Sequence, residues 1–214
     1  MKHVHLYVLD TFADWEPGYL LAELNTGRFL KGGNRWPIKT VAVNASPVQS
    51  MGGLTLTPDL TLEQLRPEDS RLLILPGADT WAEEQHQAVV ELAAEFLEVG
   101  VPVAAICGAT VALAQAGMLD ERPHTSNDLD ALKHLAPAYR GEQQYRQQPV
   151  VQDANLLTAS GVAPAPSAAA AAAAALRMLN AMTPEVADAW LELNTKRDPQ
   201  AFYTLMELTQ DAST

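Results

Sequence analysis

A short, almost uninterrupted apolar run at residues 101–106 is followed directly by Cys107 and then by small residues that end at Gly117. Such a run is typical of a central parallel strand that is covered on both faces. The small residues after it predict a helix that stops at a glycine. Cys107, the only cysteine of the chain, therefore lies at a strand-to-helix turn, on the sheet edge where open α/β folds bind their ligands.

A lone thiol at such a turn has two interpretations. A single free cysteine is most often a small buried hydrophobe. At a tight strand-to-helix turn, however, the side chain is exposed and the helix N-terminus favours the thiolate, as an enzyme nucleophile requires. The strand before Cys107 and the helix after it favour the nucleophile.

Strand-like and helix-like segments alternate along the chain, starting with a strand at residues 3–9 and a helix at residues 16–30. This order predicts a flavodoxin-like three-layer α/β sandwich, with a mostly parallel sheet, helices on both faces and a nucleophile elbow at Cys107. Further elements are expected as strands at 38–43, 72–75 and 101–106, a helix at 84–99, and hairpins at 48–57 and 150–158 that decorate the sheet.

The C-terminal part of the chain is predicted to be helical. Ser167 is a good N-cap, and the alanines at 168–175 are strong helix formers whose small side chains let a helix lie close to a sheet. We assign residues 1–182 to the main domain and residues 183–214 to a helical extension packed on it. Its aromatic side chains, Trp190 among them, either cap the core or form an oligomer interface.

The charge balance disfavours one class of partner. The chain has 14 Lys and Arg residues against 26 Asp and Glu residues, a net charge of -12, whereas a nucleic-acid-binding protein needs a basic surface. No run approaches the roughly 20 apolar residues of a membrane span. One cysteine permits no internal disulfide, which favours the reducing cytoplasm. We expect a cytoplasmic protein whose partner is a small-molecule substrate.

Two other segments follow strands at the same predicted sheet edge. Asp14 and Glu16 lie at the start of the first helix, where a carboxylate ordinarily interacts with the helix dipole. Gly77 and Ala78 follow the strand at 72–75, and their backbone amides either face a reacting oxygen or belong to a plain turn. Both segments are candidates for the site that contains Cys107.

Four short motifs carry a family resemblance. They are Leu75-Pro76-Gly77, Ala105-Ile106-Cys107-Gly108-Ala109-Thr110, Trp15-Glu16 and His124-Thr125-Ser126-Asn127. Together they resemble the ThiJ/PfpI superfamily, the class I glutamine amidotransferase-like proteins that include a parkinsonism-associated stress protein, the PfpI intracellular proteases, glyoxalase III and isonitrile hydratase. The elbow and the Trp-Glu pair are the specific parts of the resemblance.

The resemblance implies roles for particular residues. Cys107 matches the family nucleophile, and Glu16 matches the acidic partner whose carboxyl group approaches the sulfur. The amides of Gly77 and Gly108 match oxyanion-binding positions. The resemblance also implies a homodimer without a cofactor. It does not imply a peptidase, because the proteolytic branch has histidine directly after the cysteine, and this chain has Gly108 there.

The histidines leave one choice open. Many relatives carry a histidine near the nucleophile after a Thr-Thr pair, and Asn127 occupies that place here, three residues after His124. His124 is either a substrate-binding residue that reaches the sulfur or a structural loop residue, and Asn127 is a second candidate for substrate binding. The other four histidines show no metal-ligand spacing, so no metal site is expected.

Three functions are compatible with these residues. The first is a cysteine-dependent enzyme of stress response acting on a small electrophile, with methylglyoxal as the substrate that the glyoxalase III resemblance implies. The second is a non-catalytic oxidative-stress sensor or chaperone in which Cys107 is oxidised. The third is an amidase or amidotransferase-like hydrolase, which ranks lower because no histidine base is evident.

Overall fold

Seven strands form the central sheet of the computed structural model, which describes residues 2–196 and 198–211. Their order is β5-β2-β1-β6-β7-β9-β8, and every neighbouring pair is parallel except the antiparallel pair of β8 and β9. The strands are β1 (His3–Tyr7), β2 (Ile38–Ala42), β5 (Leu60–Thr61), β6 (Ser70–Leu75), β7 (Val103–Ile106), β8 (Val150–Asp153) and β9 (Leu156–Ala159).

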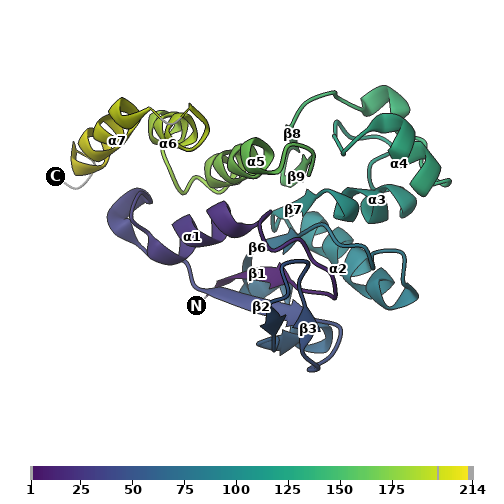
Figure 1. Cartoon of the computed structure of the whole chain (residues 1–214). Coiled ribbons are helices and arrows are strands. Elements are labelled where there is room, and N and C mark those ends of the chain that lie inside the picture. Colours follow the sequence, from purple (N-terminus) through teal and green to yellow (C-terminus); the bar gives the residue numbers. More distant parts are fainter. Residues whose placement is uncertain (1, 197, 212–214) are drawn as a thin grey trace.

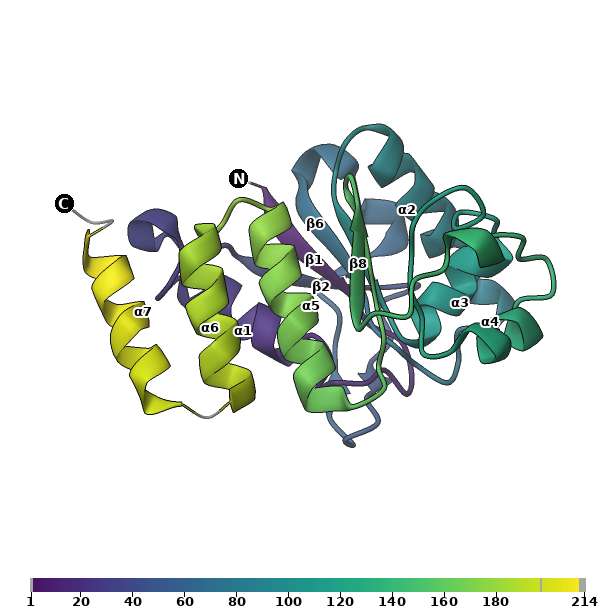
Figure 2. The ribbon, with the colours of Figure 1, turned by 90° about the horizontal axis from the view of Figure 1, so that it is seen from above.

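Helices cover the sheet on both faces (Figure 1). Figure 2 shows α1 (Gly18–Thr26), α5 (Pro164–Met178), α6 (Pro184–Lys196) and α7 (Pro199–Asp211) on one side of the strands. On the other side are α2 (Gln87–Glu98), α3 (Gly108–Gln115) and α4 (Leu129–Leu135). The predicted flavodoxin-like three-layer sandwich is therefore confirmed.

The burial of strands β6 and β7 explains why residues 101–106 are almost uninterruptedly apolar. All four residues of β7 are buried, and so are the last four residues of β6. Strands between two helical layers have no solvated face, so they lack the alternation of polar and apolar residues that a half-exposed strand shows. On one of these layers the alanines of α5 pack against the sheet, and Ala169, Ala173 and Ala175 are fully buried.

Three element predictions are wrong in detail. The first helix spans only Gly18–Thr26, because Gly27 adopts φ 71° and ends it in the left-handed conformation. Ser167 is not an N-cap, since α5 already starts at Pro164 and the Ser167 hydroxyl donates to the carbonyl oxygen of Val162. The second hairpin, β8 and β9, does not decorate the main sheet but forms its edge, whereas β3 (Val48–Gln49) and β4 (Thr55–Leu56) form a separate two-stranded sheet.

The helices after residue 183 have one buried and one exposed aromatic region. Trp190 of α6 is buried and meets the ring of Tyr19 edge-on, with the ring centroids 5.8 Å apart. Phe202 and Tyr203 of α7 are exposed. Trp190 thus packs on the core. The exposed side chains of Phe202 and Tyr203 do not test the homodimer, which stays a prediction. Among the described residues, no helix is long and apolar enough to cross a membrane.

His5 makes the fold sensitive to acid. It is buried in β1 with Nδ1 2.7 Å from the Ser70 hydroxyl, and burial lowers its pKa from 6.5 to about 4. Between these pH values the unfolded chain binds more protons than the folded chain, so the free energy of unfolding falls as the pH falls. We expect urea denaturation between pH 6.5 and pH 4 to show this loss, at up to about 1.4 kcal/mol per pH unit from this side chain.

The variant His5→Asn isolates this contribution from that of the acidic residues. Its unfolding free energy should fall less steeply with decreasing pH than that of the wild type. Equal slopes for the two proteins would show that His5 is not held neutral in the fold.

Candidate active site

The carboxyl ends of four neighbouring strands meet at one edge of the sheet. Strands β1, β6, β7 and β9 are adjacent and parallel, so the segments that follow them lie at the same edge. Glu16, Gly77, Cys107 and Gly161 come from these four segments in turn. The backbone amide of Ala13 donates to the carbonyl oxygen of Gly77 at 2.8 Å, which ties the first segment to the second.

Cys107 is the residue on the tight turn between β7 and α3. Its φ of 55° and ψ of -120° lie in a region that residues with a side chain rarely adopt. The strain is held by three hydrogen bonds: its amide donates to Ala159 O at 2.9 Å, and its carbonyl accepts from the amide and the hydroxyl of Thr110. The predicted elbow is confirmed.

Glu16 lies in the turn before α1 and is 4% exposed. Its Oε2 accepts a 2.6 Å hydrogen bond from the Gly77 amide, and its carboxyl group is hydrogen-bonded to the Cys107 thiol. A Cβ atom built on Gly161 would lie 2.7 Å from Glu16 Oε1 and 2.8 Å from Cys107 Sγ, so both atoms border the same small space. The carboxyl group therefore faces the sulfur rather than the helix N-terminus.

Burial makes both members of this pair reluctant to ionise. It raises the pKa of the Glu16 carboxyl, against the opposing effect of the hydrogen bonds from Gly77 and Cys107. Burial also raises the pKa of the Cys107 thiol, and the charge of Glu16 raises it further. Two negative charges at this distance repel, so the pair retains one proton when the first charge forms.

Asn127 contacts the sulfur of Cys107. Its Nδ2 donates to Cys107 Sγ at 3.2 Å, and its Oδ1 accepts from the amide of Gly161 at 2.7 Å. Because the Gly161 amide can only donate, the orientation of the side-chain amide is fixed, with its NH₂ group toward the sulfur. Asn127 thus stabilises the thiolate without being able to take its proton.

His124 is buried away from the sulfur and both of its ring nitrogens have protein partners. Nδ1 donates to Arg122 O at 2.7 Å, so Nε2 is left to accept from the Tyr139 hydroxyl, also at 2.7 Å. Burial lowers the pKa of His124, which keeps the ring neutral. The structure does not bring His124 to Cys107, and these contacts favour the structural interpretation of this residue.

The three backbone amides named from the sequence have different partners. The Gly77 amide is occupied by Glu16. The Gly108 amide is hydrogen-bonded to the Cys107 side chain and lowers its pKa. The Ala78 amide has no hydrogen-bond partner among the described residues. Ala78 and Gly108 are therefore the amides that a substrate oxygen can reach without displacing Glu16.

Sequence reasoning missed Gly161. This glycine leaves the space in which the thiol and the carboxyl group meet, and its amide orients Asn127. It follows strand β9 as Gly77 follows β6, so the rule that located Gly77 would also have located Gly161. Within residues 2–196 and 198–211, no group of His, Cys, Asp and Glu side chains is placed to hold a metal ion.

The Asn127 contact gives a prediction about thiol acidity. Because its hydrogen bond lowers the pKa of Cys107, Asn127→Ala should raise that pKa and shift the pH profile of iodoacetamide alkylation to higher pH. A shift of about one pH unit corresponds to the loss of a hydrogen bond to a charged group. Asn44→Ala, which removes an exposed asparagine, should leave the profile unchanged. An unchanged profile in Asn127→Ala would show that the amide does not stabilise the thiolate.

Comparisons with known proteins agree with this geometry. Residues 2–175 match the DJ-1/PfpI family. The chain is 42% identical over 206 residues to "Uncharacterized protease YoaZ" of Bacillus subtilis (strain 168), and the match covers 96% of each chain. A thiJ/pfpI family protein from Bacillus anthracis superposes with a TM-score of 0.91 at 45% identity, covering 96% of both chains. A DJ-1 superfamily protein from Agrobacterium tumefaciens superposes with a TM-score of 0.78 at 35% identity, covering 92% of this chain and 99% of its own. The chain therefore belongs to the DJ-1/PfpI family.

Proposed function

We propose that this protein is a cysteine-dependent enzyme that converts a small α-oxoaldehyde into the corresponding 2-hydroxy acid. The observation that carries the proposal is the buried pair of Cys107 and Glu16, in which the thiol and a carboxyl group of raised pKa are hydrogen-bonded. Such a pair supplies a nucleophile and a group that both gives and takes a proton near neutral pH.

Each step of this reaction uses a group of the pair. The Cys107 sulfur attacks the aldehyde carbon, and the carbonyl oxygen takes the shared proton from Glu16, which gives a hemithioacetal. The Glu16 carboxylate then removes the hydrogen on that carbon and delivers a proton to the neighbouring ketone carbon, while the hydroxyl proton of the hemithioacetal passes to the ketone oxygen, leaving a thioester of a 2-hydroxy acid. Water hydrolyses the thioester and restores the thiol. The net change adds one water to the substrate, so no external oxidant or reductant is needed.

The surroundings of the sulfur favour this reaction over amide or peptide hydrolysis. Amide cleavage requires an acid that protonates the leaving amine, a role usually taken by histidine. Here the side chains that contact the sulfur are Glu16 and Asn127, and His124 is bonded elsewhere. A histidine directly after the nucleophile would also not fit, because a Cβ on Gly108 would lie 2.9 Å from Ala78 O.

The experiment is a turnover screen of methylglyoxal, primary amides and isonitriles with the wild type and Cys107→Ala. We expect the wild type to form the 2-hydroxy acid from methylglyoxal and Cys107→Ala to form none. Turnover of amides or isonitriles alone would replace the proposed substrate class. If nothing turns over while peroxide modifies Cys107 stoichiometrically, the protein is a sensor.

A further inference from the structure

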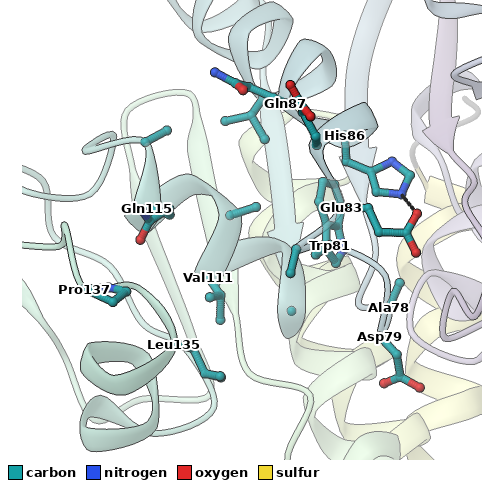
Figure 3. Close-up of a pocket in the computed structure, with 16 residues that line it drawn as sticks. Ala78, Asp79, Trp81, Glu83, His86, Gln87, Val111, Gln115, Leu135 and Pro137 are labelled. Atoms are coloured by element: carbon teal, nitrogen blue, oxygen red, sulfur yellow. Dashed lines mark ion pairs between the residues drawn. The ribbon is translucent and has the colours of Figure 1, made fainter.

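A cavity of about 650 Å³ lies beside the elbow, between the start of α2, one face of α3 and the segment after α4 (Figure 3). Small-molecule sites typically have volumes of about 300–1,000 Å³. Methylglyoxal would occupy only a small part of this space. The cavity is therefore large enough for a substituent on the reacting carbonyl compound.

The cavity begins at Ala78, whose amide has no hydrogen-bond partner among the described residues, and at Gly108. Ala78 and Gly108 both line it. Because Gly108 has no side chain, Ala78 and Trp81 approach α3 closely, and a Cβ at this position would lie 3.2 Å from Trp81 Cδ1. Cys107 itself is not part of the lining, but it is the residue directly before Gly108. The cavity therefore borders the start of α3, next to Cys107 in the chain.

One side of the cavity is apolar. One face of α3 lines the cavity. Its residues are Gly108 and those three, four and seven positions after it, Val111, Ala112 and Gln115, which is the spacing of a single helix face. Figure 3 shows Val111, Leu135 and Pro137 on the same side. Leu135 is 60% exposed, so this apolar surface is not covered by the protein. The larger apolar side chains of the lining are Trp81, Val90, Val111, Leu135 and Pro137, and the alanines are Ala78, Ala82, Ala112 and Ala116.

The other side is acidic. Asp79, Glu83 and Glu84 line the cavity, and Figure 3 shows Asp79 and Glu83 beyond Trp81 as seen from Val111 and Leu135, with the Glu83 carboxyl group turned toward His86. No lysine or arginine is among the described residues of the lining. The one histidine, His86, is buried, its Nδ1 is bonded to the Tyr7 hydroxyl, and its Nε2 is 4.0 Å from a Glu83 oxygen. Since burial lowers the pKa of His86, the carboxylates keep their negative charge uncompensated.

We propose that this cavity is the recognition pocket of the Cys107 site and that it binds an organic cation, an ammonium group carried on an aromatic or branched apolar body. The carboxylates attract the positive charge, and the indole of Trp81 between the two sides adds a cation–π contact. The apolar side accepts the body of the ligand. If the proposed function holds, this ligand also carries the carbonyl group that reacts with Cys107. The binding of the cation itself does not rest on the proposed function.

Binding is measured by calorimetry with benzyltrimethylammonium, which cannot condense with carbonyl groups, and with benzyl alcohol and benzenesulfonate as neutral and anionic probes. We expect the cation to bind at least about tenfold more tightly than the neutral probe, and less tightly as salt is added. The anion should bind weakest. Equal affinity for the three probes, or tightest binding of the anion, would overturn the proposal.

Two variants locate the site. Asp79→Asn combined with Glu83→Gln should lower the affinity for the cation about tenfold and leave the affinity for benzyl alcohol unchanged, because removing two nearby charges affects only the charged probe. Ala112→Trp should fill the cavity and abolish binding of both. The matched control is Glu95→Gln combined with Glu98→Gln, which removes two exposed carboxylates of α2 outside the cavity. If this control weakens the cation equally, binding follows net charge and the pocket is not the site.

The same probes separate this proposal from the proposed function. In Cys107→Ala the cation should bind as in the wild type, because the sulfur is not in the lining. Turnover of methylglyoxal without binding of the cation would contradict the proposed cation pocket and leave the proposed enzyme activity supported. Binding of the cation without turnover of any α-oxoaldehyde, including one that carries a benzyltrimethylammonium group, would contradict the proposed enzyme activity and leave the cation site supported.

Discussion

Replacing Glu16 with glutamine is expected to lower the turnover of methylglyoxal by about 10²- to 10⁴-fold, the range that a general acid–base group contributes. Glutamine keeps the shape of the side chain and its Oε1 can still accept the hydrogen bond from the Gly77 amide. It cannot take a proton from carbon or return one. The variant therefore loses the transfer between neighbouring carbons but not the arrangement of the site.

Thiol alkylation distinguishes this loss from a collapsed site. The charge of Glu16 raises the pKa of Cys107, so Glu16→Gln should react with iodoacetamide at least as fast as the wild type at neutral pH. Asp14→Asn is the matched control, since Asp14 is a carboxylate of the same segment that bonds the Ser50 hydroxyl instead of the sulfur. Wild-type turnover in Glu16→Gln would remove Glu16 from the mechanism and leave it a structural role.

Gly161→Ala is expected to impair both alkylation and turnover, each by about 10- to 100-fold, because misplacement of reacting groups by about 1 Å has effects of this size. The new Cβ would lie within 2.8 Å of both Cys107 Sγ and Glu16 Oε1, so one of them must move. Overpacking of this kind typically costs about 1–3 kcal/mol of stability. A thermal melt should show a lowered but cooperative transition.

Gly18→Ala is the matched control for this change. A Cβ at Gly18 would meet nothing within 4 Å, and the residue opens α1, where alanine suits a helix better than glycine. Its turnover and alkylation should equal those of the wild type. If Gly161→Ala also reacts normally, the space between the thiol and the carboxyl group does not need to be empty, and the close pairing of Cys107 with Glu16 is not required.

The sequence alone was sufficient for the fold and for the position of Cys107 at the elbow, because both have local signatures. Within about twenty residues the sequence has a fully apolar strand, then a cysteine, then a helix of small residues. The structure has the same order, as β7, the elbow and α3. The ends of elements were less certain, as the early stop of α1 at Gly27 shows. That stop depends on one residue in a left-handed conformation, which the periodicity of the helix does not reveal.

The contacts of Asn127, His124 and Gly77 were decided only by the tertiary structure. Glu16 and Gly77 are 61 residues apart in the chain, and Asn127 and Gly161 are 34 apart. Their hydrogen bonds exist because strand order brings β1, β6, β7 and β9 side by side, and local patterns do not encode strand order. The sequence could therefore determine which side chains are chemically capable, but only the packed sheet decided which of them lie next to the sulfur.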